Sequence, residues 1–295
     1  TNTTGASNVA VGKDSLYTNS TGSNNTSIGQ GSLYYNTASN NTAVGRNALA
    51  ANTTGTQNIA VGVETLDANT TGNYNVAVGK AALGSNTTAS NNTAVGQEAL
   101  DANTTGDSNT GVGFYALKSN TTGNYNIAIG QEALEGNTTA EYSVAIGHKA
   151  LELSNGTRNT AIGGYNSSLT TTGAYNTAIG YGAFYANTTG SNNVAIGYGS
   201  LDASTTAIYN TAVGSMSLSG TTTGSNNTAV GRSALLANTT ANDNTAVGFN
   251  ALYANTTGTR HVGIGVSALD ANTTGTENLA IGYNALSQNT TGSYN

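Results

Sequence analysis

Residues 41–57 read NTAVGRNALAANTTGTQ, and residues 58–74, which follow directly, read NIAVGVETLDANTTGNY. This unit repeats along the chain, and we number its columns from its first glycine, which is column 0. Column 0 is occupied by Gly12, Gly29, Gly45, Gly62, Gly79, Gly96, Gly113, Gly130, Gly147, Gly163, Gly180, Gly197, Gly214, Gly231, Gly248, Gly265 and Gly282. The spacing is 17 residues except for two steps of 16, which end at Gly45 and Gly163. Both short units lack one residue of the Asn-Thr-Thr-Gly segment, which predicts a turn there, because turns tolerate changes of length.

Residue types are segregated by column. Column −1 holds Val or Ile in every unit, column −2 holds Ala, Ser or Gly, and column +4 holds Leu except at Ser167 and Phe184. All 22 charged residues, 8 basic and 14 acidic, fall in columns +1, +2, +5, +11 and +12. A disordered chain would scatter its charges. The segregation therefore predicts that these five columns face water and that the others are packed or hydrogen-bonded.

The composition excludes several classes of protein. The 295 residues carry a net charge of −6, only 7% of them are charged, and the chain has no Cys and no Pro. Without Cys there is no disulfide framework and no thiolate metal site. The few Lys and Arg residues argue against nucleic-acid binding. No apolar run in this segment approaches the roughly 18 residues of a membrane span.

The period itself predicts the fold class. Seventeen residues are too few for a helical hairpin, and Asn, Thr, Gly and Val disfavour helix. We expect an all-β chain, a β-solenoid (β-roll) of about seventeen 17-residue coils stacked about 4.8 Å apart. Residues 1–295 are predicted to form a single repetitive rod, a segment of a longer repetitive chain. The glycines of columns 0 and +10 are expected to supply positive φ angles where the coil bends.

The alternation of side chains along a strand assigns the faces of each coil. Columns −3 and −1 are β-branched or aliphatic and are predicted to lie inside with the Leu of column +4. Column −2 then points outward, and its small, uncharged residues predict a stripe for close approach of another chain. The predicted association stripe is Ala10, Ala43, Ala60, Ala77, Ala94, Ala128, Ala145, Ala161, Ala178, Ala195, Ala212, Ala229, Ala246 and Ala280.

Asparagine recurs in two columns. Column −4 departs from Asn only at Ser143 and His261, which indicates either a hydrogen-bonded Asn ladder or a preference for turn geometry; the two can hold together. In column +7, Asn-Thr-Thr triplets fit the N-glycosylation acceptor pattern. The candidate acceptors are Asn52, Asn69, Asn86, Asn103, Asn120, Asn137, Asn187, Asn238, Asn255 and Asn272.

The pattern offers little for catalysis. His148 and His261 lie in different columns, a solvent column and the Asn ladder, and no nucleophile, base and orienting acid recur together. Acidic residues of column +5 skip coils, which does not fit a calcium roll. The Gly-x-Gly sequences, such as Gly180–Gly182 and Gly197–Gly199, lack a following helix and are weak phosphate loops. We expect no enzyme activity, no cofactor and no metal.

Ser143-Val144-Ala145-Ile146-Gly147 reads SVAIG, and residues 193–197 read NVAIG. This motif, present once per coil along the whole chain, resembles the head repeat of trimeric autotransporter adhesins of the YadA type. It is also similar to the NTAIG-type repeats of bacterial and phage tail-fibre proteins. The resemblance implies a left-handed β-roll, three chains packed side by side, and a surface-exposed fibre. The longer coil, with its constant Asn-Thr-Thr-Gly arm, departs from the adhesin heads.

Two functions from different classes follow. The first is a structural repeat protein, the rod of an extracellular fibre or adhesin at a cell surface or on a virion, which associates with copies of itself as a homotrimer or filament. The second is a ligand-binding solenoid whose Thr and Asn ladders bind ice or glycan. Many of the 16 Tyr residues lie in solvent columns, such as Tyr74 and Tyr185, which suits sugar or protein contact. A host or cell surface, or its glycans, is therefore a further candidate partner.

Overall fold

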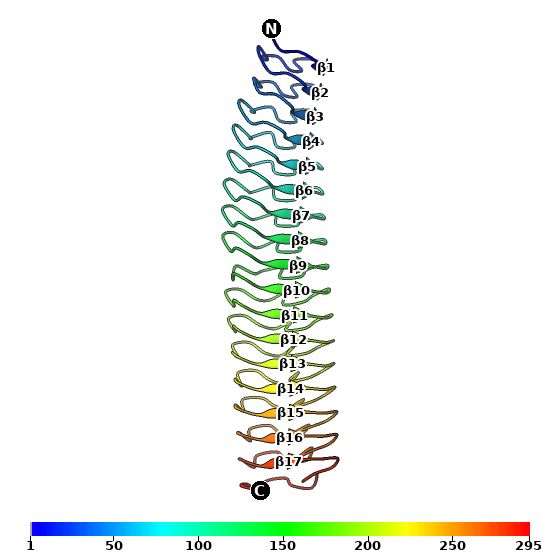
Figure 1. Ribbon diagram of the computed structural model, residues 1–295, viewed down its shortest axis with the longest axis vertical. Helices are drawn as coiled ribbons and strands as arrows, with labels where there is room; N and C mark the ends of the chain where they lie inside the picture. The colour runs from blue at the N-terminus through cyan, green and yellow to red at the C-terminus, as the bar shows by residue number, and fades with distance from the viewer. Residues whose placement is uncertain (1) are drawn as a thin grey trace. The chain divides into compact units, whose positions relative to one another are not determined.

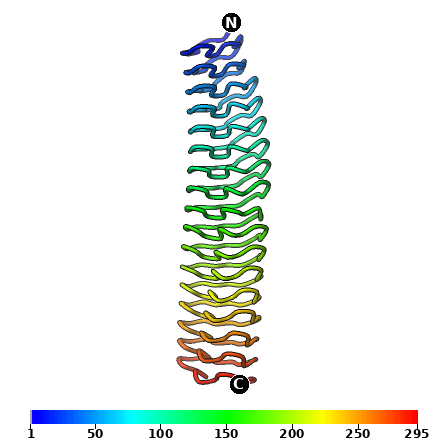
Figure 2. The backbone as a smooth tube through the Cα atoms, turned by 180° about the vertical axis from the view of Figure 1, so that it is seen from behind, coloured from blue at the N-terminus to red at the C-terminus, as the bar shows by residue number. Residues whose placement is uncertain are grey.

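The computed structural model describes residues 2–295, and these contain seventeen parallel β-strands of three residues each, one per coil (Figures 1 and 2). The β-solenoid fold is thereby confirmed. The chain divides into two compact units, Thr1–Ser143 and Val144–Asn295. The first unit contains β1 (Val9–Val11), β2 (Thr26–Ile28), β3 (Thr42–Val44), β4 (Ile59–Val61), β5 (Val76–Val78), β6 (Thr93–Val95), β7 (Thr110–Val112) and β8 (Ile127–Ile129). The second contains β9 (Val144–Ile146), β10 (Thr160–Ile162), β11 (Thr177–Ile179), β12 (Val194–Ile196), β13 (Thr211–Val213), β14 (Thr228–Val230), β15 (Thr245–Val247), β16 (Val262–Ile264) and β17 (Leu279–Ile281).

Within each unit, every strand pairs in parallel with the next strand in sequence, column against column. In the first unit Ala43 is opposite Ala60, and in the second Ala161 is opposite Ala178. The register survives the two short steps, since Thr26 pairs with Thr42 and Val144 pairs with Thr160. The missing residue of each short coil is therefore absorbed outside the strand, as the sequence predicts.

Glycine in column 0 ends each strand with a left-handed turn. Gly113, for example, has φ +138°, and a Cβ there would lie 2.5 Å from the carbonyl oxygen of Gly130 in the next coil. Both the backbone angle and the close approach exclude a side chain at this column. The same prediction for column +10 is wrong, because glycines such as Gly72 do not have a φ in the left-handed region and Ala89 takes the next place in the column.

The interior of each coil is narrow and filled by small side chains around one Leu. Ala43, Ala48 and Leu49, in columns −2, +3 and +4 of one coil, are all fully buried. At Gly111, which takes the column −2 position, an added Cβ would lie 3.4 Å from Cγ of Leu100, so column −2 packs on the Leu column. The predicted burial of Leu is confirmed, whereas the predicted burial of columns −3 and −1 is wrong.

Every residue of the Leu column adopts a left-handed backbone conformation, with φ 53° at Leu49. Such a conformation costs a residue with a Cβ about 1–2 kcal/mol, and it persists only where the surroundings impose it. Here the bonds to the neighbouring coils impose it: the Leu49 amide donates to the Thr65 carbonyl at 3.0 Å, and the Glu64 amide donates to the Arg46 carbonyl at 2.9 Å.

Both Asn columns are buried and form ladders, which confirms the ladder interpretation. In column −4, the Asn58 amide N–H donates to Oδ1 of Asn41 at 3.0 Å, and Asn58 Nδ2 donates to the Gly72 carbonyl at 2.8 Å. In column +7, Asn69 Nδ2 donates to Oδ1 of Asn52 at 2.9 Å and to the same Gly72 carbonyl at 3.1 Å. Each amide thus ties its own coil to its neighbours.

The column +7 ladder has a gap at Ser204. In the coil before it, Oδ1 of Asn187 is buried without a hydrogen-bond partner, and the Ser204 hydroxyl is likewise unpaired. In an intact stretch of the ladder, Oδ1 of Asn69 accepts from Asn86 at 2.9 Å and Oδ1 of Asn86 accepts from Asn103 at 3.0 Å.

This difference predicts that two substitutions in the ladder change the stability in opposite directions. Asn86→Ala removes one donor and one acceptor from buried partners, so it should lower the free energy of unfolding by about 2–3 kcal/mol. Ser204→Asn supplies a donor to Asn187 Oδ1 and should raise the free energy of unfolding by about 1 kcal/mol. Urea denaturation followed by circular dichroism measures both. Destabilisation by Ser204→Asn would contradict the ladder as the source of the effect.

The coil that begins at Gly163 departs from the consensus in its core. Ser167 takes the Leu position with φ 51° and is buried, whereas Leu169 lies two residues later and is 37% exposed. The backbone path is retained although the side chain that normally fills it has moved to the surface. The coil shape is therefore set by the stack rather than by the Leu side chain alone.

Candidate functional site

The predicted association stripe lies inside the coils. Its alanines are buried, with exposed fractions of 0–3%; the exception is Ala10 in the first coil, which is exposed. The prediction that column −2 forms an association surface is therefore wrong for Ala43, Ala60, Ala77, Ala94, Ala128, Ala145, Ala161, Ala178, Ala195, Ala212, Ala229, Ala246 and Ala280. The physical reason is space: beside the Leu column the narrow interior admits one small side chain per strand, and the two larger flanking residues must point outward.

The outward residues of the strands form the candidate interaction surface. We call columns −3 and −1 together the outer strand face. In column −1 the exposed fraction is 36% at Val61 and 66% at Ile281, and in column −3 it is 42% at Ile59. Neither column carries a charged residue anywhere in the chain. A surface of aligned β-branched side chains, repeated in every coil, is unusual for a protein that stays alone in water.

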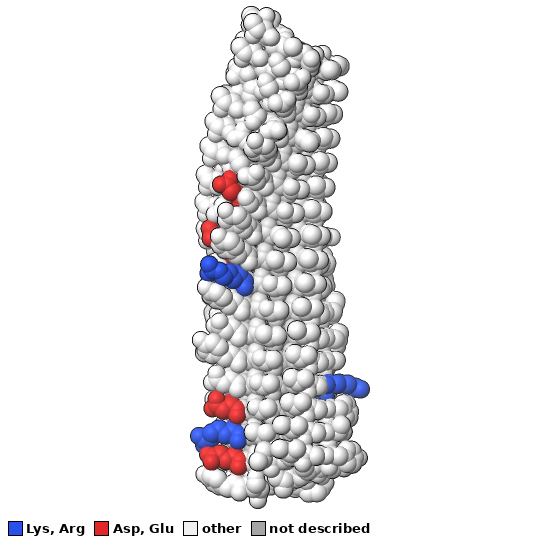
Figure 3. Space-filling view, in the orientation of Figure 1, with Lys and Arg blue, Asp and Glu red and all other residues white. Residues whose placement is uncertain are grey.

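Charged side chains lie beside this face rather than on it. In Figure 3 the region over the strands is uncharged, and Lys, Arg, Asp and Glu gather near the margins. Some of them pair between neighbouring coils: Arg46 contacts Glu64 at 2.7 Å, and Lys118 contacts Glu98 at 2.9 Å. The hydrogen bond from Lys118 holds the pKa of the Glu98 carboxyl below its ordinary value. None of the charged residues among residues 2–295 is buried, which confirms the five solvent columns.

The two faces of a single strand offer a direct test of this assignment. Ala94→Leu would force three extra heavy atoms into the packed interior and should lower the free energy of unfolding by about 1–3 kcal/mol or more. Val95→Leu, one residue later on the outer strand face, should change it by less than about 0.5 kcal/mol. Thermal and urea denaturation of the two variants measure these changes in the free energy of unfolding. Equal losses, or a larger loss from Val95→Leu, would refute the inward orientation of Ala94.

The candidate glycosylation sites are also buried. Asn52, Asn69, Asn86, Asn103, Asn120, Asn137, Asn187, Asn238, Asn255 and Asn272 are all fully buried. Their Nδ2 atoms, to which a glycan would be attached, donate hydrogen bonds within the stack, as Asn120 Nδ2 does to Asn103 Oδ1 at 2.8 Å. A glycan at this atom has no room in the folded coil, so the prediction that these residues are accessible acceptors is wrong.

The threonine hydroxyl groups of column +8 likewise form hydrogen bonds between coils. In column +8 the Thr53 hydroxyl donates to the Thr70 carbonyl at 2.9 Å, and the same bond recurs from Thr70 to Thr87 at 3.0 Å. Most threonines of column +8 are half-buried, although Thr53 itself is exposed, and the next column, to which Thr54 belongs, is exposed. The Asn ladders and the column +8 Thr ladder therefore serve the stack and do not present themselves to a ligand.

His261 stands in the Asn ladder and is fully buried. Its Nδ1 accepts the Asn278 amide N–H at 3.2 Å, as an Asn Oδ1 does elsewhere in the column. Burial lowers the pKa of the His261 imidazole. The neutral ring thus replaces an Asn side chain as a hydrogen-bond acceptor.

A pH dependence follows from that lowered pKa. Below about pH 6.5, the ordinary value for histidine, the unfolded chain takes up a proton that the folded chain resists. The free energy of unfolding therefore has its full value above this pH. It should decrease as the pH falls toward the lower pKa that His261 has in the folded state. His261→Asn should remove this component while other titrations stay common to both proteins. Urea denaturation from pH 8 to pH 5 gives the difference, and parallel curves would exclude the effect.

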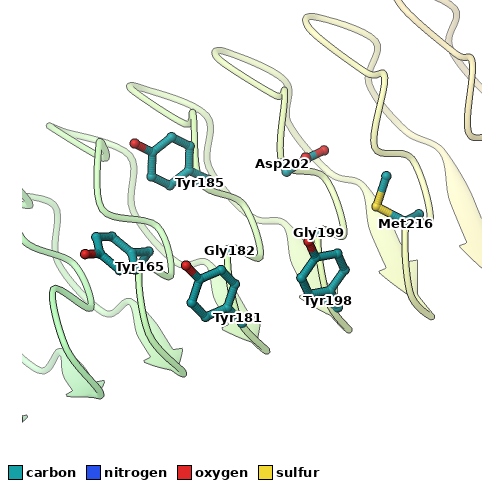
Figure 4. Close-up of a pocket in the computed structure, with 8 residues that line it drawn as sticks. All are labelled: Tyr165, Tyr181, Gly182, Tyr185, Tyr198, Gly199, Asp202 and Met216. Carbon is teal, nitrogen blue, oxygen red and sulfur yellow. The ribbon is translucent and has the colours of Figure 1, made fainter.

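A groove in the second unit escaped the sequence analysis. It has a volume of about 510 Å³ and is bounded by Tyr165, Tyr181, Gly182, Tyr185, Tyr198, Gly199, Asp202 and Met216 (Figure 4). The available signal was the Tyr-Gly dipeptide in columns +1 and +2 of two successive coils. The sequence pattern treats these glycines only as weak phosphate loops, whereas in the structure they leave column +2 without a side chain in two adjacent coils.

No family model matches the chain, and a search of the curated proteins finds no relative. Among residues 2–295 there is no helix of the length and apolarity that crossing a bilayer requires. The function is therefore argued from the geometry of the repeat alone.

Proposed function

We propose that the chain is a structural repeat protein of an extracellular fibre or adhesin, and that copies of it associate through the outer strand face. The observation that carries this proposal is the uncharged, β-branched surface that every coil presents. It replaces the alanine stripe as the contact, because the alanines are buried. The proposal assigns the chain no catalytic group and no cofactor.

The partner that best fits the outer strand face is the same face of a second copy of the chain. A partner must be uncharged at the contact, and it must match a rise of about 4.8 Å per coil along the stack. Another copy meets both conditions, since all charges lie in five other columns. With a net charge of −6, copies repel one another overall, and a contact confined to uncharged columns keeps the acidic groups in solvent.

The size of the face is also sufficient. A stable protein interface takes roughly 20–30 residues from each partner. The outer strand face supplies 16 residues from the eight coils of the first unit and 18 from the nine coils of the second, and all of them are Thr, Val, Ile or Leu. Aliphatic side chains of this kind, aligned in files, gain about 25 cal/mol for each Å² that association removes from water.

Matched charge substitutions in the same two coils test the contact. Val61→Lys with Val95→Lys places two charges on the outer strand face, where each side chain is over one third exposed and the monomer should fold unchanged. Gln57→Lys with Asn91→Lys is the control, because column +12 naturally carries Arg158 and Arg260. Sedimentation velocity should show a reduced mass for the first pair and the parent mass for the control, with unaltered circular dichroism.

Two results would contradict the proposal. The first is a parent protein that is monomeric at all accessible concentrations. The second is a Val61→Lys, Val95→Lys variant that keeps the parent mass while folded. Ice binding through the exposed Thr file is the competing function from the sequence, and thermal hysteresis by a monomeric parent would favour it instead.

A further inference from the structure

We propose that the tyrosine groove of the second unit binds a neutral oligosaccharide, with pyranose rings seated on Tyr181 and Tyr198. The inference is independent of association, because the groove is built from columns +1, +2 and +5 rather than from the outer strand face. It follows from the shape of the groove, from the chemistry of its walls, and from the groups that it lacks.

The groove exists because two neighbouring coils carry glycine at column +2. In the other coils this column holds Asp, Asn, Glu, Ala, Tyr, Lys, Met, Ser or, once, the isolated Gly31, and only Gly182 and Gly199 are glycines in consecutive coils. A Cβ added at Gly182 would meet nothing within 4 Å. The column continues with Tyr165 before the pair and Met216 after it, so the hollow is closed at both ends.

One wall is an aromatic platform. The rings of Tyr181 and Tyr198 lie 6.2 Å apart between centroids and only 10° from parallel, and Tyr165 approaches Tyr181 at 5.8 Å. The side chains of Tyr181 and Tyr198 are 58% and 61% exposed, so the solvent side of each ring is open. Figure 4 shows these rings in a row along successive coils, with the two glycines between them and the opposite wall.

The opposite wall supplies hydrogen-bonding groups. Asp202 and Tyr185 face the platform across the glycines (Figure 4). The Asp202 carboxyl borders the glycine hollow, because a Cβ added at Gly199 would lie 3.8 Å from its Oδ2, and the same carboxyl accepts a hydrogen bond from the Ser219 side chain. A sugar hydroxyl in the hollow can donate to this carboxylate, and a hydrogen bond to an ionised group is stronger than one between neutral groups. Tyr hydroxyl groups at the rim both donate and accept.

This combination selects the chemical class of the ligand. A pyranose ring presents an apolar C–H face to an aromatic ring and hydroxyl groups at its edge, which match the platform and the carboxylate. The groove-lining residues include no Lys, Arg or His, so the site offers nothing to a phosphate or a carboxylate. The two near-parallel rings form one wall rather than a box, unlike the aromatic cages that enclose quaternary ammonium groups. An extended volume across successive coils suits several linked sugars.

The experiment uses the full chain and a panel of neutral linear hexasaccharides of glucose, N-acetylglucosamine, mannose and galactose. Isothermal titration calorimetry and saturation-transfer NMR should detect binding of at least one of them. Tyr198→Ala should weaken that binding at least tenfold by removing half of the platform. Gly182→Asn should do the same by filling the hollow, and it should fold normally because Asn47 has φ 58° in the same column.

Two further variants complete the design. Asp202→Ala should weaken binding of the same hexasaccharide several-fold, because it removes the acceptor for the sugar hydroxyl. Tyr74→Ala, an exposed tyrosine of column +12 in the first unit, is the control and should leave the affinity within twofold. Circular dichroism and thermal denaturation establish that each variant is folded.

The proposal is overturned if no hexasaccharide of the panel binds the parent. It is also overturned if binding persists unchanged in both Tyr198→Ala and Gly182→Asn while the two are folded, since the sugar then sits elsewhere. Tetramethylammonium chloride is the remaining probe: if it binds and is lost in Tyr198→Ala while no sugar binds, the groove is a cation site instead.

Discussion

The structure depends on two columns of buried asparagines, which bond from coil to coil and also converge on one backbone carbonyl per turn. The Gly72 carbonyl accepts hydrogen bonds from Asn58 Nδ2 at 2.8 Å and from Asn69 Nδ2 at 3.1 Å, and both asparagines also bond to the preceding coil. A lone coil would lose the bonds to the preceding coil, namely that of the Asn58 amide N–H to Asn41 Oδ1 and that of Asn69 Nδ2 to Asn52 Oδ1. Each buried group left unpaired costs about 1–3 kcal/mol. Stacking is therefore the condition for burying them, and stability becomes a property of neighbouring coils rather than of any single one.

This polar scaffold explains why so small an apolar core suffices. Most coils bury one Leu and a few alanines, as Leu66 and Ala60 illustrate, while the larger β-branched residues remain outside. The bonds between coils also hold the Leu column in a left-handed conformation that its own propensity opposes. The same constraint produces the outer strand face, because the interior has no room for Val or Ile. An apolar surface is thus a direct consequence of how the inside is packed.

The sequence predicts those parts of the fold that depend on periodicity and polarity. The 17-residue coil, the turn that absorbs deletions, the solvent columns and the Asn ladder all follow from segregation by column. Which side chains of each strand point into the coil does not follow from the sequence, because in a three-residue strand a shift of one residue exchanges the two faces. Hydrophobicity favours Val and Ile inside, but steric space decides otherwise. The sequence does record that limit, because column −2 holds only Ala, Gly and one Ser, at Ser27.

The groove escaped prediction for a related reason. In a repeat, each column is first interpreted through its consensus, and a residue that departs from it looks like tolerated variation. Gly182 and Gly199 gain meaning only as a consecutive pair, with Tyr181 and Tyr198 beside them and Asp202 across the hollow. Because the stack fixes the backbone of every coil, deleting side chains changes surface relief without altering the fold. A regular solenoid can therefore acquire a binding site through a few substitutions, and such sites are to be sought where two adjacent coils depart from the consensus in the same column.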